Sequence, residues 1–84
     1  MKDKVLVKLV VPIIDESYDI FLPVSRKIGS VIKLLNKAIG ELSNGLYVGG
    51  TSNFLYSSET GERYNLDAIV KSTDIRNGAR IVLF

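Results

Sequence analysis

The sequence contains no cysteine and no histidine. Without cysteine there can be no disulfide framework, no thiolate metal site and no thiol nucleophile. Without histidine there is no side chain that ordinarily exchanges protons near neutral pH, and no partner for a Ser-His or Cys-His pair. Both usual zinc ligands are therefore missing, and carboxylates and lysines are the only remaining groups for catalysis. We expect a protein that is not an enzyme and holds no metal or other cofactor.

Charge of one sign and long apolar runs are also scarce. Eleven Lys and Arg residues against nine Asp and Glu residues give a formal net charge of +2, far below the basic blocks of nucleic-acid-binding tails. The first apolar run spans about eight residues and is interrupted by Lys8, which is too short for a signal peptide or a membrane span. We expect a cytoplasmic protein with no direct membrane insertion. Its 84 residues suffice for one domain, 1–84, and no more.

The first half of the chain predicts a hairpin and one long helix. Residues 4–11 alternate as in a strand until Pro12, and residues 18–22 alternate again until Pro23. Apolar residues then recur at the three-and-four spacing of one helical face. These residues are Ile28, Val31, Ile32, Leu35, Ala38 or Ile39, and Leu42. Ser25 is the expected N-cap, and residues 43–45 the expected stop.

The second half carries weaker signals. We expect two short strands, a flexible loop and a single helical turn before a closing strand. The two strands are at 54–57 and 62–64, with a weaker strand signal at 46–48. The loop is expected at 49–53, a turn at 58–61, the helical turn at 66–70 and the closing strand at 80–84. The Asn77-Gly78 pair predicts a turn with positive φ that aims the chain into that last strand.

These elements predict an α+β fold of the β-grasp type. If the closing strand lies beside the first strand, the helix crosses one face of a mixed sheet and every strong apolar stripe is covered. The expected sheet has four to five strands and one long helix.

The chain resembles the ubiquitin-like superfamily over nearly its whole length. Its second half follows the order of ubiquitin through 55–61, Leu66-Asp67, Asp74-Ile75, Asn77-Gly78 and 81–83. Within the superfamily it is similar to the YukD/EsaB group, the small ubiquitin-like proteins of bacterial type VII secretion systems. The residues that carry this likeness are 18–23, Ile28, Val31-Ile32, Leu35 and 74–78.

The resemblance implies a non-enzymatic accessory or regulatory protein of the secretion machine that acts by protein contact. It also implies a secretion-system ATPase or a membrane component as partner, and no small-molecule substrate. The diglycine tail of ubiquitin has no counterpart here, because the sequence closes on Phe84 in an expected strand. We therefore expect a protein that is not conjugated to others.

The face of the sheet opposite the helix is the candidate site. Strand parity places Val5, Val7, Leu9, Tyr18, Ile20, Leu22, Ile81 and Leu83 inward. It leaves seven residues outward, namely Leu6, Lys8, Val10, Phe21, Arg80, Val82 and Phe84. Five of the seven are apolar, whereas a solvated sheet face is normally polar. This cluster, edged by Lys4, Lys8 and Arg80, predicts a protein-binding surface.

Several alternatives stay open. A second copy of the chain or the loop residues Ile13-Ile14 could cover the cluster, or the apolar residues could simply be exposed. Phe21 and Phe84 could instead stack on nucleic-acid bases, and a sulfur-carrier or modifier role is a further alternative. Asp15-Glu16 and Asp19 fit a solvated loop better than a cation site.

Overall fold

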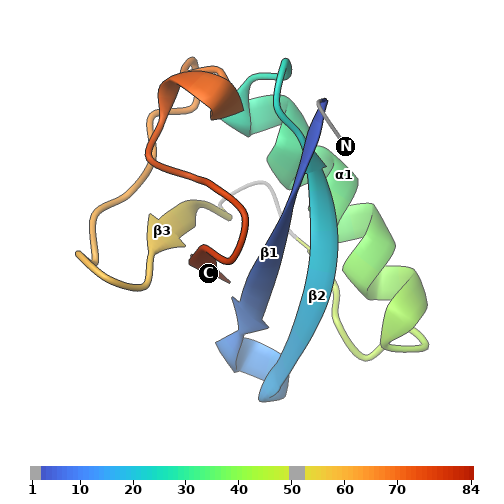
Figure 1. Ribbon diagram of the computed structural model, residues 1–84. Coiled ribbons are helices and arrows are strands. Elements are labelled where there is room, and N and C mark those ends of the chain that lie inside the picture. The colour runs from blue at the N-terminus through green and yellow to red at the C-terminus, as the bar shows by residue number, and fades with distance from the viewer. Residues whose placement is uncertain (1–2, 50–52) are drawn as a thin grey trace.

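The computed structural model describes residues 3–49 and 53–84, and over these ranges it contains four strands, one α-helix and two short 3-10 helices. In chain order the elements are β1 (Lys4–Val11), η1 (Pro12–Ile14), β2 (Glu16–Pro23), α1 (Ile28–Leu42), β3 (Leu55–Ser57), η2 (Val70–Ser72) and β4 (Arg80–Leu83). Figure 1 shows the long strands β1 and β2 side by side, with the C-terminal end of the chain close to β3.

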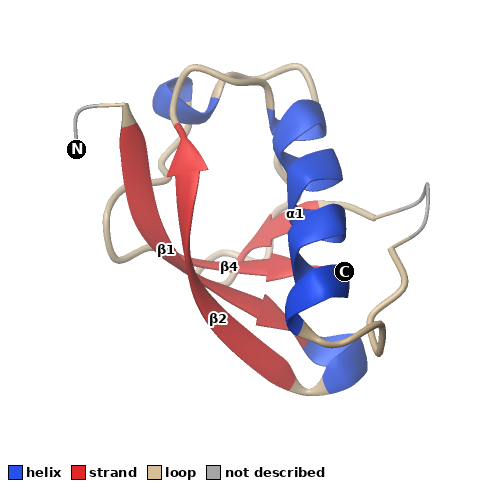
Figure 2. Cartoon of the chain, turned by 90° about the vertical axis from the view of Figure 1, so that its right-hand side faces the viewer, coloured by secondary structure: helices blue, strands red, loops and turns tan. Residues whose placement is uncertain are grey.

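The four strands form one mixed sheet in the order β2-β1-β4-β3. β1 is antiparallel to β2 and parallel to β4, and β3 is antiparallel to β4. The parallel pair therefore joins the first strand to the last. Figure 2 shows α1 lying along one side of this sheet. The predicted β-grasp architecture is confirmed, with four strands.

The core lies between the sheet and α1. The predicted alternation is confirmed, because Val7, Leu9, Ile81 and Leu83 are each at most 1% exposed. The helix contributes five buried side chains, which are Ile28, Val31, Ile32, Leu35 and Ile39. Burial of each contributes about 1.5–3 kcal/mol. The inward residues of β2 are less well covered, since Leu22 is buried whereas Tyr18 and Ile20 are only partly buried.

The beginning of α1 differs from the prediction. Ser25 is not the N-cap; the helix begins at Ile28, and Lys27 occupies the cap position without a side-chain hydrogen bond. Instead, the N–H groups of Ile28 and Gly29 donate to the carbonyl oxygens of Ala68 and Leu66 at 2.8 and 3.0 Å. Two of the donors that every helix leaves unpaired are thus satisfied by a distant segment.

The end of α1 agrees with the predicted stop but not with the predicted core. Gly45 has a φ of 81° and donates its N–H to Gly40 at 2.8 Å, which is the bond of a Schellman-type end. Leu42, expected in the core, is 58% exposed because the last helical turn extends beyond the buried residues of the sheet.

The segment after α1 was predicted less well. Residues 46–48 are not a strand, although Tyr47 is buried and donates its hydroxyl to Asn36 Oδ1 at 2.6 Å. Of the predicted loop, residues 50–52 lie outside the described residues. The third strand is confirmed as β3. The expected strand at 62–64 is reduced to one bridge between Arg63 and Tyr56.

The approach to β4 differs in one position and agrees in another. The expected helical turn at 66–70 is replaced by η2, which begins at Val70 and ends at Ser72. Gly78 has a φ of 86°, as the predicted turn requires. Its N–H donates to the Leu6 carbonyl at 2.8 Å, so the turn is attached directly to β1.

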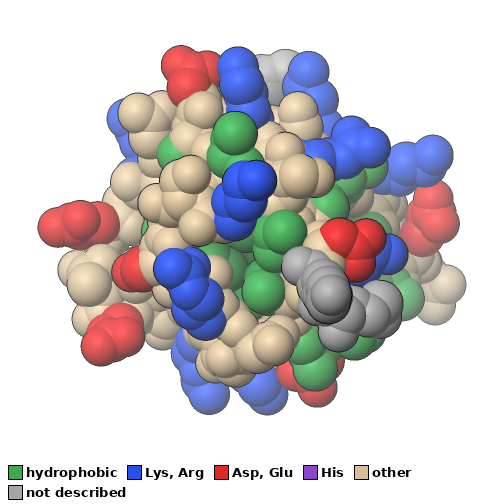
Figure 3. All heavy atoms as spheres, turned by 45° about the horizontal axis from the view of Figure 1, so that its top comes forward, with side chains coloured by type: hydrophobic (Ala, Val, Ile, Leu, Met, Phe, Trp, Pro, Cys, Tyr) green, Lys and Arg blue, Asp and Glu red, His purple; other side chains and the backbone are tan. Residues whose placement is uncertain are grey.

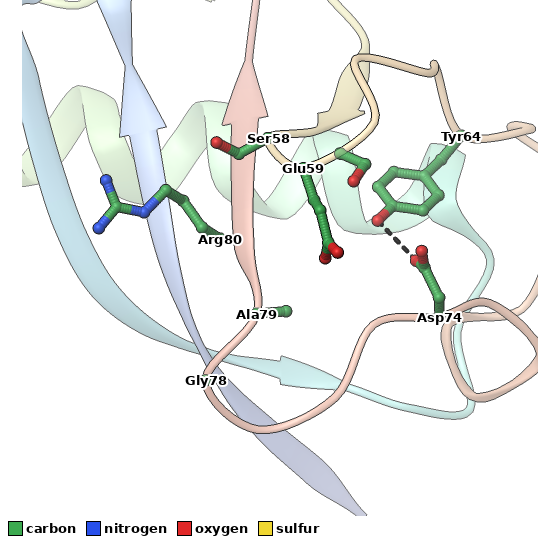
Figure 4. A pocket seen from close by; sticks show the side chains of 8 residues that line it. Ser58, Glu59, Tyr64, Asp74, Gly78, Ala79 and Arg80 are labelled. Atoms are coloured by element: carbon green, nitrogen blue, oxygen red, sulfur yellow. Dashed lines mark hydrogen bonds between the residues drawn. The ribbon is translucent and has the colours of Figure 1, made fainter.

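A tyrosine–carboxylate hydrogen bond joins two parts of the long connection between β3 and β4. Tyr64 donates its hydroxyl to Asp74 Oδ1 at 2.7 Å, as Figure 4 shows. Partial burial, followed by the hydrogen bond to the Asp74 carboxylate, raises the pKa of Tyr64 from 10.0 to about 12. The phenol is therefore fully protonated at neutral pH.

We expect the Asp74→Asn substitution to lower the pKa of Tyr64 from about 12, because it removes the negative charge and keeps an oxygen acceptor. The folded pKa lies above the unfolded one, so the contribution of Tyr64 to stability is complete below pH 10 and is lost as the pH rises through about 12. NMR titration of the Tyr64 ring carbons measures the pKa. Tyr64→Phe should lack this part of the alkaline loss of stability. A Tyr64 that titrates at its ordinary pKa in the unmodified chain would contradict the assignment.

Candidate functional site

The seven residues predicted for the contact surface all lie on the face of the sheet that α1 does not cover, here called the open face. Leu6, Phe21 and Phe84 are 40%, 50% and 67% exposed. Lys8 and Arg80 are exposed, and Val10 and Val82 are partly buried by their neighbours. The predicted outward orientation is confirmed, while the binding role stays a prediction.

Strand register brings these residues together in rows across the open face. Leu6 lies opposite Phe21, and Lys8 lies opposite both Asp19 on β2 and Arg80 on β4. The next row joins Val10 to Val82. Directly opposed side chains on one sheet face are within contact distance. The candidate residues therefore form a continuous surface over β2, β1 and β4.

Three further residues belong to the open face and were missed from the sequence. Tyr56 lies opposite Val82, so its side chain points to the same face. Phe54 and Phe84 exchange two backbone hydrogen bonds of 3.0 Å, and the Arg63 guanidinium lies 4.4 Å from the Phe54 ring centroid. This is a cation–π distance. The alternation of 54–57 was visible, but its register against β4 was not.

Apolar and charged rows alternate across the open face. Val10, Val82 and Tyr56 form one row, here called the apolar row, and Leu6 and Phe21 form another. The row between them holds Lys8, Arg80 and Asp19, and Arg63 is paired with Tyr56. Protein interfaces typically combine apolar contacts with polar ones, and complementary charge steers the partner. The arrangement suits a protein partner that offers apolar groups together with acidic side chains.

Figure 3 shows the basic side chains on one further side of the molecule. There, Lys and Arg side chains are dispersed among uncharged atoms, and Asp and Glu side chains are present on the same side of the molecule. Nucleic-acid binding depends on several phosphate contacts at once. The charge distribution on this side offers no continuous path for a phosphate backbone.

A second group of exposed aliphatic side chains lies outside the open face. Ile13, Leu46 and Val48 are 75%, 68% and 84% exposed and line a shared hollow of about 500 Å³ together with Ile14, Asp15 and Tyr47. Ile14 packs against the core. The loop at Ile13-Ile14 is thus engaged with the segment after α1, which gives no support to the alternative that it covers the open face.

The hollow in Figure 4 is polar and lies beside the beginning of β4. It has a volume of about 320 Å³ and is lined by the carboxylates of Glu59 and Asp74 and by the hydroxyls of Ser57, Ser58 and Tyr64. Figure 4 shows the Arg80 guanidinium pointing away from Glu59 and Asp74. Tyr64 holds its proton up to a pKa of about 12, so it is not adjusted for proton transfer near neutral pH. Within residues 3–49 and 53–84, no three or more acidic side chains gather into a group that could hold a metal ion.

A third hollow, of about 460 Å³, lies between α1 and the segment that caps it. Lys27, Lys33 and Leu66 are among its lining residues. A Cβ atom on Gly29 would lie 3.4 Å from the Leu66 carbonyl oxygen, which is an ordinary van der Waals contact, so packing within the chain leaves room for a small side chain at this position. The two donors at the start of α1 are already used, and this end of the helix offers no ready anion site.

Comparison with known proteins gives matches only at the level of structure. No protein-family model and no curated protein matches the sequence. The ubiquitin-like domain of EccD5 from Mycobacterium xenopi matches with a TM-score of 0.78 and 16% identity, covering 96% of this chain and 92% of that domain. The ubiquitin-like domain of the Mycobacterium tuberculosis type VII secretion system protein EccD1 matches with a TM-score of 0.77 and 11% identity, covering 95% and 96%.

A third match is to a chain of a much larger assembly. The MycP5-free ESX-5 inner membrane complex contains a chain that matches with a TM-score of 0.71 and 15% identity, covering 98% of this chain and 21% of that one. In the present protein, none of the helices in the described ranges has the length and hydropathy that a membrane crossing needs. At these identities the likeness establishes the fold. The chain has the ubiquitin-like fold that its sequence predicted.

Proposed function

We propose that this protein is a non-conjugated, ubiquitin-like accessory or regulatory component of a bacterial type VII secretion system, of the YukD/EsaB kind. It acts by binding another protein through the open face, without catalysis. The observation that carries the proposal is the apolar row formed by Val10, Val82 and Tyr56 beside the charged row of Lys8, Asp19 and Arg80. The similarity to EccD ubiquitin-like domains supports the choice of secretion system.

Docking follows from the physical properties of this surface. Removal of the apolar side chains of the open face from water supplies the favourable free energy of binding, at about 25 cal/mol per Å² of apolar surface. Phe84 and Leu6 are the anchors we expect to contribute most, because they are large, apolar and well exposed. Lys8, Arg63 and Arg80 then select a partner with acidic side chains.

A cytoplasmic component of the secretion machine is the partner that fits best. One matched chain belongs to an ESX-5 inner membrane complex, so a membrane component or the secretion ATPase is a reasonable candidate. The proposed location is cytoplasmic. A gene neighbourhood that encodes an FtsK-like ATPase and small WxG-type substrates would support this assignment.

Phe84 belongs to the proposed binding surface. Its backbone is paired with Phe54 through two hydrogen bonds of 3.0 Å, and its side chain is 67% exposed. We therefore propose a docking role for Phe84 in preference to the alternative of a sulfur-carrier or modifier.

The double substitution Leu6→Ser and Phe84→Ser tests the binding surface. We expect the chain to stay folded, because both side chains are exposed, and the affinity for the purified type VII ATPase or membrane component to fall about 30-fold. This corresponds to a loss of about 2 kcal/mol at an interface anchor. Isothermal titration calorimetry measures the affinity, and circular dichroism checks the fold.

The matched control is the double substitution Leu46→Ser and Val48→Ser, which alters two aliphatic residues that are even more exposed and lie away from the open face. It should leave the affinity within about twofold, since residues outside an interface contribute little. Equal losses in both variants would contradict the placement of the site. Unfolding of the first variant would assign Leu6 and Phe84 to the core.

Salt dependence separates protein binding from nucleic-acid binding. The cations of the open face, Lys4, Lys8, Arg63 and Arg80, are dispersed among apolar side chains and Asp19, so we expect the affinity for the protein partner to change little between about 50 and 200 mM salt. An affinity for single-stranded oligonucleotides that is tight at low salt and falls with a slope near −0.7 per phosphate contact would instead favour nucleic-acid binding. Fluorescence anisotropy at several salt concentrations distinguishes the two.

A further inference from the structure

One edge of the sheet is free and the other is covered. β3 forms one end of the sheet, but its outer side is bonded to the following segment: Tyr64 N–H donates to the Leu55 carbonyl at 2.9 Å, and Ser57 N–H donates to the Glu62 carbonyl at 2.9 Å. β2 forms the other end. Among the described residues, no backbone hydrogen bond outside the helices and the strand ladders involves Glu16–Pro23.

The ladder of β1 identifies which groups of β2 are free. Lys8 N–H donates to the Ala79 carbonyl and the Leu6 carbonyl accepts from Gly78, so even-numbered residues of β1 point their backbone groups toward β4. Odd-numbered residues of β1 therefore bond to β2, and their partners are Leu22, Ile20, Tyr18 and Glu16. The backbone groups of Ser17, Asp19 and Phe21 point away from the sheet.

The free edge has defined ends. Pro23 has no N–H group and stops further pairing beyond Phe21. At the other end the chain turns at Asp15, which has a φ of 52°. Three residues with one donor and one acceptor each are thus available to an added strand, which suits a partner segment of about five residues.

The side chains along this edge define the chemistry of the occupant. Asp15, Glu16 and Asp19 are exposed, and no Lys or Arg lies between positions 15 and 23. Lys8 on β1 lies opposite Asp19 on the inner side of this strand, so the charged side chains of the outer edge itself are all acidic. Toward the helix, Tyr18 and Ile20 are only partly buried although they belong to the core face. Leu34 and Asn36 are two residues apart in α1, and at about 100° per residue they lie on opposite flanks of the helix. Leu34 is 46% exposed.

We propose that the free edge of β2 is a docking site for an extended basic segment of a partner protein, which adds to the sheet beside Ser17, Asp19 and Phe21. Alternate residues of that segment point to the two faces of the sheet. Basic side chains on one face would lie near Asp19, and apolar side chains on the other would cover Tyr18 and Ile20. This edge does not include the row of Val10, Val82 and Tyr56 on the open face. The edge and that row can therefore bind one partner or two different partners.

The probe is a peptide of about seven residues in which lysine alternates with valine. It is added to the full chain, whose backbone amides are followed by hydrogen exchange NMR. At a peptide concentration of about ten times the Kd, we expect exchange of the Ser17, Asp19 and Phe21 amides to slow about tenfold. The Tyr18 and Ile20 amides are already bonded to β1 and should change less.

Two control peptides and one variant separate the contributions. A peptide with N-methylated backbone amides keeps its charge but cannot add as a strand, and we expect it not to slow exchange. A peptide with glutamate in place of lysine should bind more weakly. Asp19→Lys should reverse the preference between the lysine and glutamate peptides, because residue 19 lies on the exposed edge and its backbone pairing does not depend on its side chain.

Four outcomes would overturn the proposal. They are equal binding of the N-methylated peptide, equal or tighter binding of the glutamate peptide, no effect of the lysine peptide on the three edge amides, and protection of these amides in the free chain that increases with protein concentration. The last outcome would show that a second copy of the chain occupies the edge. None of these outcomes depends on the side chains of Leu6 and Phe84, so these two anchors can be judged separately.

Discussion

The insertion of β4 between β1 and β3 is the interaction on which the rest of the structure depends. β4 is parallel to β1 on one side and antiparallel to β3 on the other, so it joins the N-terminal hairpin to the second half of the chain. Its inward residues Ile81 and Leu83 are fully buried. Its outward residues Arg80 and Val82 join the open face. Core and candidate site are therefore two faces of one short strand.

The same insertion sets the charge and shape of the open face. Val82 links Val10 of β1 to Tyr56 of β3, and without β4 these residues would have no common neighbour. Phe84 and Phe54 continue the row, with Arg63 over the Phe54 ring. A surface on which apolar and charged rows alternate results from strand register. The two sheet edges then differ, because only the edge at β3 is covered by following residues.

Local patterns determined what the sequence could predict. The alternation of residues 4–11 and the three-and-four spacing from Ile28 to Ile39 report burial directly, because the period of each element fixes which side chains share a face. The helix start could not be found this way, since the acceptors for Ile28 and Gly29 come from Leu66 and Ala68. Tyr56 was missed for a related reason, because its place depends on the pairing of β3 with β4.

We propose that the open face contacts a protein of a type VII secretion machine. The decisive experiment is site-specific photocrosslinking in cells with an intact secretion system. A photoreactive phenylalanine analogue is placed at Phe84 in one strain and at Val48 in another. Both positions are well exposed, at 67% and 84%, and only the first lies on the open face. We expect a crosslink to a secretion component from position 84 and none from position 48. A crosslink from position 48 alone, or from position 84 to nucleic acid, would show that the open face is not the protein-binding surface.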